Sequence, residues 1–331
     1  MAPAVFRGYY ELPAALVACA VLVLAVLYRD PRSRFNRRPL HPAWLSLAAL
    51  CLTLAVTLAC QVSEARRGAR VTLRSFYGRL QVVEEGEPNS PWFMRKLKHG
   101  TITHGLQYLH PQRIQLPTAY YGSRSGGGLA ILNANRDSPQ RVGLIGLGAG
   151  VMAAYGRAGD LYRFYEINPQ VVKLARSQFT YLTQSPAKVE VKLGDARLSL
   201  EREANQEFDV LVVDAFASDS IPVHLLTLEA TELYFRHLKR EGVLAVHISN
   251  RYLNLEPVLE CAARQMGKAA LLIEDQPPRP AAISVSTWVL LANRKEVFEQ
   301  SAFKKAGSAP EPQAGLRTWT DDYSNLFQTL K

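Results

Sequence analysis

The stretch VGLIGLGAG at residues 142–150 decides the fold, because a short apolar run passes directly into a glycine-rich turn. The turn holds Gly146, Gly148 and Gly150, and an apolar helix start is expected after it. Glycines at such a turn let the backbone approach a ligand closely at a helix N-terminus. A dinucleotide-binding turn needs another glycine three residues after Gly148, where Val151 stands, so a nicotinamide cofactor is disfavoured. A purely structural tight turn is the alternative.

Further short apolar runs alternate with amphipathic patterns downstream of this turn, which is typical of a parallel sheet covered by helices. They predict an α/β, Rossmann-like sheet of seven strands. The predicted strands begin at residues 142, 162, 189, 208, 242, 269 and 286, and the predicted helices cover 168–179, 196–204, 227–240 and 255–266. Residues 302–315 read as a linker.

Acidic residues follow the next two predicted strands. Glu166 ends the second strand, about 20 residues past Gly146, where a carboxylate can accept hydrogen bonds from both hydroxyls of a ribose. Asp195 follows the third strand over the same edge of the sheet, where it could contact an adenine amino group. Aspartate is also a good N-cap for the helix that follows, so a capping role is the alternative for Asp195.

The fourth strand ends in Asp214, and Asp219 follows five residues later. Ligands of open α/β sheets bind outside the carboxyl ends of the strands, so both carboxylates are expected beside the reacting group of a co-substrate. Two carboxylates there favour a cationic partner, and one of them could accept the proton that an amine must lose before it attacks. Capping of the next helix is the alternative role of Asp219.

The histidines and cysteines show no metal-ligand spacing, so no metal site is predicted. His247 lies inside a predicted strand and is interpreted as a packed core residue, whereas His224 lies near a loop. His99 and His104 fall in a predicted loop and receive no catalytic role, because no serine or cysteine nucleophile is near. Asp321 could add charge to the site or lie at the surface.

The N-terminal part holds two uncharged apolar runs, residues 12–28 and 44–62, each near the roughly 20 residues that cross a bilayer as a helix. A signal peptide and a buried hairpin are the alternatives. The net charge of +10 suggests nucleic acid or an anionic membrane, and arginines beside the apolar runs favour the membrane. We therefore expect a membrane hairpin at 1–65, a small β-rich unit at 70–134 and a catalytic domain at 135–331.

The order of the motifs resembles the spermidine synthases, the polyamine aminopropyltransferases, and most closely their bacterial membrane-fused relatives. The likeness covers roughly residues 75–327 and rests on FYGRLQV, HGTITHGLQ, PTAYYG, GLGAG, YEINP, GDARLSLE, DAFASDSIPVHLLT, HISNRYL and WTDDYSNLF. It implies a fold of the S-adenosylmethionine-dependent transferases. It also implies transfer of an aminopropyl group from decarboxylated S-adenosylmethionine to an amine such as putrescine, giving spermidine and methylthioadenosine. The short N-terminal part looks like the end of a longer transporter-like region.

The resemblance also implies residue roles. Asp214 would be the proton acceptor or amine anchor, Glu166 the ribose ligand and Asp195 the adenine contact, while Tyr121 would line the amine pocket and Asp219 would supply the second carboxylate. A homodimer is common in the family, and no nucleic acid is expected as a partner. Because the cofactor is made in the cytoplasm, we expect the catalytic domain on the cytoplasmic side of a bacterial inner membrane.

Two positions depart from the family's pattern. Ala149 stands where the glycine motif usually carries an aspartate for the amine end of the decarboxylated cofactor, and Gly122 stands beside the pocket tyrosine in place of glutamine or histidine. Ala149 favours a second hypothesis, a methyltransferase that uses ordinary S-adenosylmethionine, which the same fold supports. A non-catalytic module that binds a nucleoside or polyamine is a third.

Overall fold

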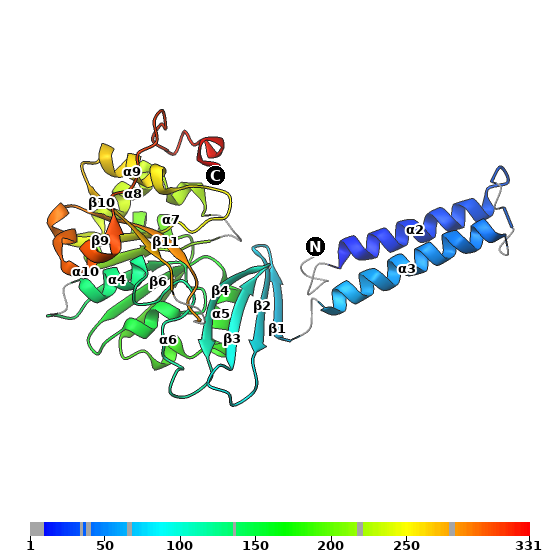
Figure 1. The fold of residues 1–331 in the computed structure, drawn as a ribbon, viewed down its shortest axis with the longest axis horizontal. Coiled ribbons are helices and arrows are strands. Elements are labelled where there is room, and N and C mark those ends of the chain that lie inside the picture. The colour runs from blue at the N-terminus through cyan, green and yellow to red at the C-terminus, as the bar shows by residue number, and fades with distance from the viewer. Residues whose placement is uncertain are drawn as a thin grey trace. The chain divides into compact units, whose positions relative to one another are not determined.

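The computed structural model describes residues 10–33, 36–37, 41–64, 68–134, 137–216, 221–277 and 282–331. The chain divides into two compact units, Met1–Arg79 and Leu80–Lys331 (Figure 1). The division predicted from the sequence, into residues 1–65, 70–134 and 135–331, stays a prediction.

The first unit contains two long apolar helices and one strand. Helices α2 (Glu11–Arg29) and α3 (Pro42–Glu64) lie side by side in Figure 1, and the rings of Tyr28 and Trp44 are 6.4 Å apart near the turn between them. Both helices are long and apolar enough to cross a membrane, and none of the residues in their most apolar windows is buried. Strand β1 (Ala69–Ser75) follows, and Arg74 in it pairs with Glu11 at the start of α2.

The second unit begins inside strand β2 (Gly78–Glu85), which belongs to a small antiparallel sheet. Strands β2 (Gly78–Glu85), β3 (Met94–His99) and β4 (Ile102–Tyr108) pair in sequence order. The prediction of a β-rich segment is therefore confirmed, but the assignment of HGTITHGLQYL to a loop was wrong, since most of it forms the end of β3 and the whole of β4. The glycines after Ser125 open helix α4 (Gly126–Asn133), capped by the Ser125 hydroxyl, which accepts a hydrogen bond from the Gly128 N–H over 3.1 Å.

The large sheet has the strand order β12-β10-β11-β9-β8-β5-β6-β7. All seven predicted strands are present, and the Rossmann-like α/β prediction is confirmed. Strands β5, β6, β7, β8 and β9 run parallel, and the last three pairings at the other side of the sheet are antiparallel. The strands are β5 (Arg141–Ile145), β6 (Leu161–Glu166), β7 (Lys188–Leu193), β8 (Phe208–Val213), β9 (Leu238–His247), β10 (Ala269–Asp275), β11 (Ser286–Ala292) and β12 (Gly307–Ser308).

Helices cover this sheet and bury its apolar strands. Amphipathic helices form where predicted: α5 (Pro169–Gln178), α7 (Ala196–Arg202), α8 (Leu228–Arg236) and α9 (Glu256–Gln265), with the short α6 (Tyr181–Gln184) after α5. Two details were wrong. The predicted helix at 227–240 ends earlier, because residues from Leu238 join β9, and the predicted linker contains helix α10 (Ser301–Ala306) and the edge strand β12.

Strand β5 is the point from which the parallel strands extend in both directions, with β6 on one side and β8 on the other. Crossover connections leave in opposite directions at such a point, so a crevice opens outside the carboxyl ends of the strands. The residues that follow β5, β6 and β8 all meet at this edge. The strand order therefore brings the glycine turn, Glu166 and Asp214 together.

Candidate active site

The glycine turn after β5 is fixed by close contact with neighbouring backbone. Gly146 has φ +101°, and a Cβ there would stand 2.4 Å from the carbonyl oxygen of Asp214. Gly148 has φ +52°, and a Cβ there would stand 2.3 Å from the carbonyl oxygen of His104 in β4. Both positions need glycine for conformation and for space. The segment that follows, Val151–Tyr155, is a 3₁₀ helix (η1) rather than the expected α-helix, and it begins after Gly150.

Glu166 faces this turn from the end of β6. One carboxylate oxygen accepts the Leu147 N–H over 3.1 Å, and the other accepts the Asn168 N–H over 2.7 Å. Burial raises the pKa of the Glu166 carboxyl, and these backbone N–H donors work in the opposite direction. These two bonds hold the side chain at the turn, and its predicted role as a ribose ligand stays a prediction.

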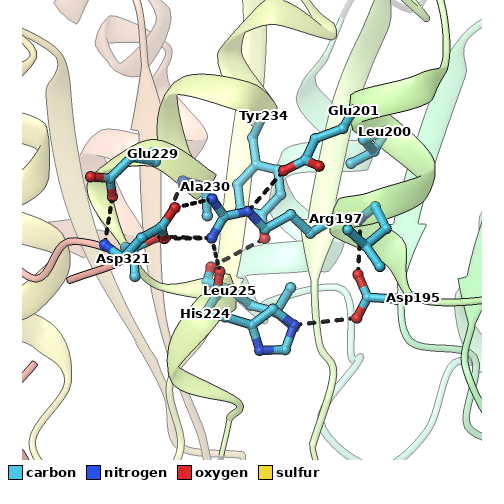
Figure 2. Close-up of polar contacts among 12 residues, drawn as sticks. Asp195, Arg197, Leu200, Glu201, His224, Leu225, Glu229, Ala230, Tyr234 and Asp321 are labelled. Atoms are coloured by element: carbon cyan, nitrogen blue, oxygen red, sulfur yellow. Dashed lines mark hydrogen bonds and ion pairs between the residues drawn. The ribbon is translucent and has the colours of Figure 1, made fainter. Parts of the chain in front are cut away.

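Asp195 caps helix α7. Its Oδ1 accepts the Leu198 N–H over 2.9 Å, so the capping alternative is confirmed. Its Oδ2 lies 3.3 Å from Nε2 of His224, as Figure 2 shows. The cap uses only Oδ1 of Asp195. An adenine contact would use Oδ2, and it stays a prediction.

A dense polar network joins α7 to the C-terminal segment beside Asp195 (Figure 2). The guanidinium of Arg197 donates to both carboxylate oxygens of Asp321, over 2.7 and 2.5 Å, and Arg197 also donates to the His224 carbonyl oxygen. The Asp321 N–H donates to Glu229 over 3.0 Å. The Arg197 guanidinium lowers the pKa of Asp321. Asp321 therefore fastens the tail to α7 and α8, which answers the question that its sequence position left open.

Asp214, immediately after β8, is held by two side chains at once. Tyr121 Oη donates to Oδ2 over 2.5 Å, and His247 Nδ1 lies 2.6 Å from Oδ1. A carboxylate has no proton to give, so Nδ1 carries the hydrogen of the second bond. His247 is 3% exposed, so the prediction of a packed histidine is right about burial, but it missed this bond. The sequence feature that could have revealed this bond is the position of His247 at the end of β9, the strand next to β8.

The far side of the His247 ring is also fixed. Nε2 lies 2.7 Å from the Ser249 hydroxyl, whose oxygen accepts the Thr287 N–H over 2.8 Å. The ring stacks on Trp288 with centroids 4.4 Å apart and planes 15° apart. With Nδ1 turned to Asp214, Nε2 is the ring nitrogen that meets the Ser249 hydroxyl. Ser249 and Trp288 therefore set the orientation in which His247 meets Asp214.

Tyr121 is a neutral donor. Burial and the neighbouring Asp214 carboxylate hold the pKa of its phenol well above the usual value of 10. Its backbone is anchored by the Tyr155 hydroxyl, which donates to the Tyr121 carbonyl oxygen over 2.5 Å. The adjacent Gly122 lies against Ile283, because a Cβ at Gly122 would be 3.0 Å from that side chain. A larger residue at position 122 would have to displace Ile283.

A cavity of about 580 Å³ opens beside these residues, and its lining includes Tyr121, Asp214 and Gly148. His104, Arg251 and Lys331 line it as well, and sequence reasoning assigned none of them to the site. Asp214 is the only acidic side chain among the described lining residues. The predicted second carboxylate, Asp219, lies outside the described residues.

Within the ranges that the structure describes, no three His, Cys, Asp or Glu side chains gather as a metal site would need. The four cysteines are free.

No family model matches the chain. It is 30% identical over 159 residues to a polyamine aminopropyltransferase of Vibrio vulnificus (strain CMCP6), an alignment that covers 45% of this chain. The chain spans about half the length of that relative, 50%. Its fold matches a probable spermidine synthase from Corynebacterium glutamicum ATCC 13032 with a TM-score of 0.57 at 19% identity, over 77% of this chain and 98% of that one.

The chain is similar in fold to a spermidine synthase structure. A spermidine synthase from Thermotoga maritima is also similar, with a TM-score of 0.47 at 15% identity, over 74% of this chain and 80% of that one. Ala149, the residue noted above in the glycine motif, lies in a confined place. Ala149 is 1% exposed, and its Cβ lies 2.7 Å from where a Cβ of Gly105 would stand. An aspartate in its place would be enclosed between β4 and the glycine turn.

Proposed function

We propose that this chain transfers an aminopropyl group from decarboxylated S-adenosylmethionine to an amine such as putrescine, giving spermidine and methylthioadenosine. The observation that supports it best is the fixed carboxylate of Asp214, held by Tyr121 and His247 at the edge of a cavity that reaches the glycine turn. A cationic amine is attracted to a carboxylate in such a place, and an aligned amine needs no covalent catalyst.

In the proposed reaction the amine first loses a proton, for which Asp214 is the acceptor or the anchor. The amine nitrogen then forms a bond to the carbon next to the sulfonium, and the carbon–sulfur bond breaks with its electron pair going to sulfur. Both oxygens of Asp214 already accept one hydrogen bond, so each keeps a lone pair for the amine. Tyr121 and His247 serve the reaction by keeping this carboxylate in place.

The nucleoside part of the co-substrate fits the residues at the carboxyl edge of the sheet. Glu166 presents a buried carboxylate that suits two ribose hydroxyls, and Gly146, Gly148 and Gly150 form the turn below. Asp195 would contact the adenine through Oδ2, which already lies 3.3 Å from Nε2 of His224. The aminopropyl end fits less well, because the buried Ala149 offers it no carboxylate.

This misfit favours a second candidate, methyl transfer from ordinary S-adenosylmethionine. A carboxylated cofactor would be repelled by an aspartate at position 149, and alanine removes that repulsion. The same sheet supports both chemistries because activity depends on the site rather than the fold.

We also propose that α2 and α3 anchor the chain in a membrane, with the catalytic domain on the cytoplasmic side. The support is their length, their apolar composition and the absence of burial along their most apolar windows.

Product analysis by mass spectrometry tests these proposals directly. The full chain in detergent is given putrescine, cadaverine, agmatine or spermidine with either decarboxylated or ordinary S-adenosylmethionine. Methylthioadenosine plus an amine heavier by one aminopropyl group establishes the transferase and identifies its acceptor. S-adenosylhomocysteine with a methylated product moves the assignment to methyl transfer. Neither product, together with retained nucleoside binding, supports a non-catalytic module.

A further inference from the structure

Asp195 and His224 meet at the carboxyl edge of the large sheet, beside Glu166. The Gly194 N–H donates to the Glu166 carbonyl oxygen over 2.9 Å, so Asp195 follows a residue that is bonded to the end of β6. The side chains of Asp195 and His224 are 22% and 50% exposed, so a ligand at this edge can reach both. Nε2 of His224 lies 3.3 Å from Oδ2 of Asp195, the atom that an adenine contact would use.

Both oxygens of the Asp195 carboxylate are held in place. Oδ1 accepts the Leu198 N–H in the cap of α7, and His224 meets Oδ2. A cap alone would leave the carboxylate free to turn, because the last torsion of an aspartate side chain has a broad energy minimum. The contact with His224 removes that freedom. Since a carboxylate oxygen has two lone pairs, Oδ2 keeps one acceptor direction for a ligand.

The C-terminal motif WTDDYSNLF, residues 319–327, holds the backbone of His224. Arg197 donates to the His224 carbonyl oxygen over 2.9 Å, and the same guanidinium bonds to both carboxylate oxygens of Asp321 (Figure 2). Asp321 Oδ1 also accepts the hydroxyl of Thr227 over 2.9 Å. The Arg197 side chain is 13% exposed, so water has little access to these bonds.

Two further bonds give the C-terminal motif one position on the start of α8. The Leu228 N–H donates to the Trp319 carbonyl oxygen over 2.9 Å, and the Asp321 N–H donates to the Glu229 carboxylate over 3.0 Å. Trp319 is fully buried in the core of the second unit. The motif is therefore a fixed support for the segment that carries His224.

We propose that the C-terminal motif sets the adenine selectivity of the nucleoside site, by positioning Asp195 through Arg197 and His224. This proposal rests on the adenine contact of Asp195 proposed above. Adenine has an amino group at carbon 6, which donates to a carboxylate oxygen, whereas hypoxanthine has a carbonyl oxygen there and an N–H at the next ring atom. A carboxylate that could turn would follow that N–H, but a fixed Oδ2 faces the carbonyl oxygen and rejects hypoxanthine.

Equilibrium binding of 5′-methylthioadenosine and 5′-methylthioinosine to the full chain in detergent tests the proposal. His224→Ala removes the contact to Asp195, and His224→Gln keeps a side chain that can donate. Asp321→Asn weakens the pair with Arg197. Asp322→Asn is the matched control, because it makes the same charge change at the next, exposed position. Asp195→Asn keeps a good helix cap and tests the adenine contact itself.

The unchanged chain and Asp322→Asn should bind the adenosine compound about tenfold more tightly than the inosine compound, the factor that one hydrogen bond of about 1.4 kcal/mol provides. His224→Ala should lose most of this preference, and His224→Gln should recover part of it. Asp321→Asn should reduce the preference by about two- to fivefold, as expected for a partly exposed ion pair. Asp195→Asn should abolish it.

The ratio of the two affinities separates positioning from a loss of local structure, which would weaken both nucleosides equally. An unchanged ratio in His224→Ala overturns the role of His224. An unchanged ratio in Asp321→Asn, or an equal loss in Asp322→Asn, overturns the role of the C-terminal motif. A ratio that also survives in Asp195→Asn, or is absent from the unchanged chain, overturns the adenine contact as well. Because binding is measured without turnover, the expected pattern without any aminopropyl product overturns the proposed reaction and leaves this inference standing.

Discussion

His247 donates a hydrogen bond from Nδ1 to Oδ1 of Asp214 over 2.6 Å, across two neighbouring parallel strands, β8 and β9. The bond fixes the plane of the carboxylate, and Tyr121 fixes its other oxygen. A carboxylate held in this way can present its remaining lone pairs in only a few directions. The consequences for activity can be measured residue by residue.

Replacing the carboxylate should separate binding from turnover. We expect Asp214→Asn to bind the nucleoside co-substrate normally and to lower kcat by roughly 10²–10⁴-fold, the usual contribution of a positioned acid or base. The amide keeps the size of the side chain but attracts an ammonium less and cannot take its proton. Asp322→Asn, at an exposed position in the C-terminal segment, is the control. An unchanged rate in Asp214→Asn would remove this residue from the mechanism.

Ser249 should affect the reaction only through His247. In Ser249→Ala the His247 Nε2 and the Thr287 N–H lose the partner that they share, so the imidazole can turn away from Asp214. We expect kcat to fall about tenfold, the effect of one hydrogen bond, while the KM for the nucleoside co-substrate stays the same. Steady-state kinetics with Ser249→Thr should recover part of the rate, because threonine restores the hydroxyl. Equal rates for the alanine variant and the unchanged chain would contradict this positioning role.

The pKa of His104 predicts a pH-dependent loss of stability. The unfolded chain binds a proton at His104 near pH 6.5, whereas the folded chain does so only near pH 4. Between these values the unfolded state holds the extra proton, so the free energy of unfolding falls as the pH drops. The loss reaches about 3 kcal/mol by pH 4 and is absent above pH 6.5.

Urea unfolding of the full chain and of His104→Leu from pH 7.5 to pH 4, followed by tryptophan fluorescence, checks this. As the pH falls, the free energy of unfolding should decrease more in the unchanged chain than in His104→Leu. A difference that is constant with pH would show that burial does not lower the pKa of His104 in this way.

The contact between Arg197 and Asp321 should hold the C-terminal segment on α7 and α8. We expect Asp321→Asn to speed tryptic cleavage at Arg317 by about two- to fivefold, since a partly exposed ion pair contributes about 0.5–1 kcal/mol. High salt should produce the same acceleration in the unchanged chain, because it screens the pair. Cleavage in Glu299→Gln, which removes a surface ion pair with Lys304 away from the tail, should match the unchanged chain. No acceleration in Asp321→Asn would place the attachment of the tail elsewhere.

The sequence by itself determined the seven main strands, the two apolar helices and the positions of Glu166 and Asp214. Each of these depends on local chemistry: apolar runs of strand length, glycines at a turn, and carboxylates directly after strands. Because parallel strands bring their carboxyl ends to one edge, local signals were enough to predict that Glu166 and Asp214 lie beside the glycine turn, where Glu166 bonds to the Leu147 N–H and the Asp214 carbonyl oxygen lies against Gly146.

Only the tertiary structure decided how the site is completed. Tyr121 meets Asp214 across 93 residues of chain, His247 meets it across 33, and Arg197 meets Asp321 across 124. Such pairs depend on strand order, on the register of β8 and β9 and on where β4 crosses the glycine turn, which no local pattern specifies. For the same reason the sequence placed His104 in a loop and gave it no role, although the fold puts it in the lining of the cavity.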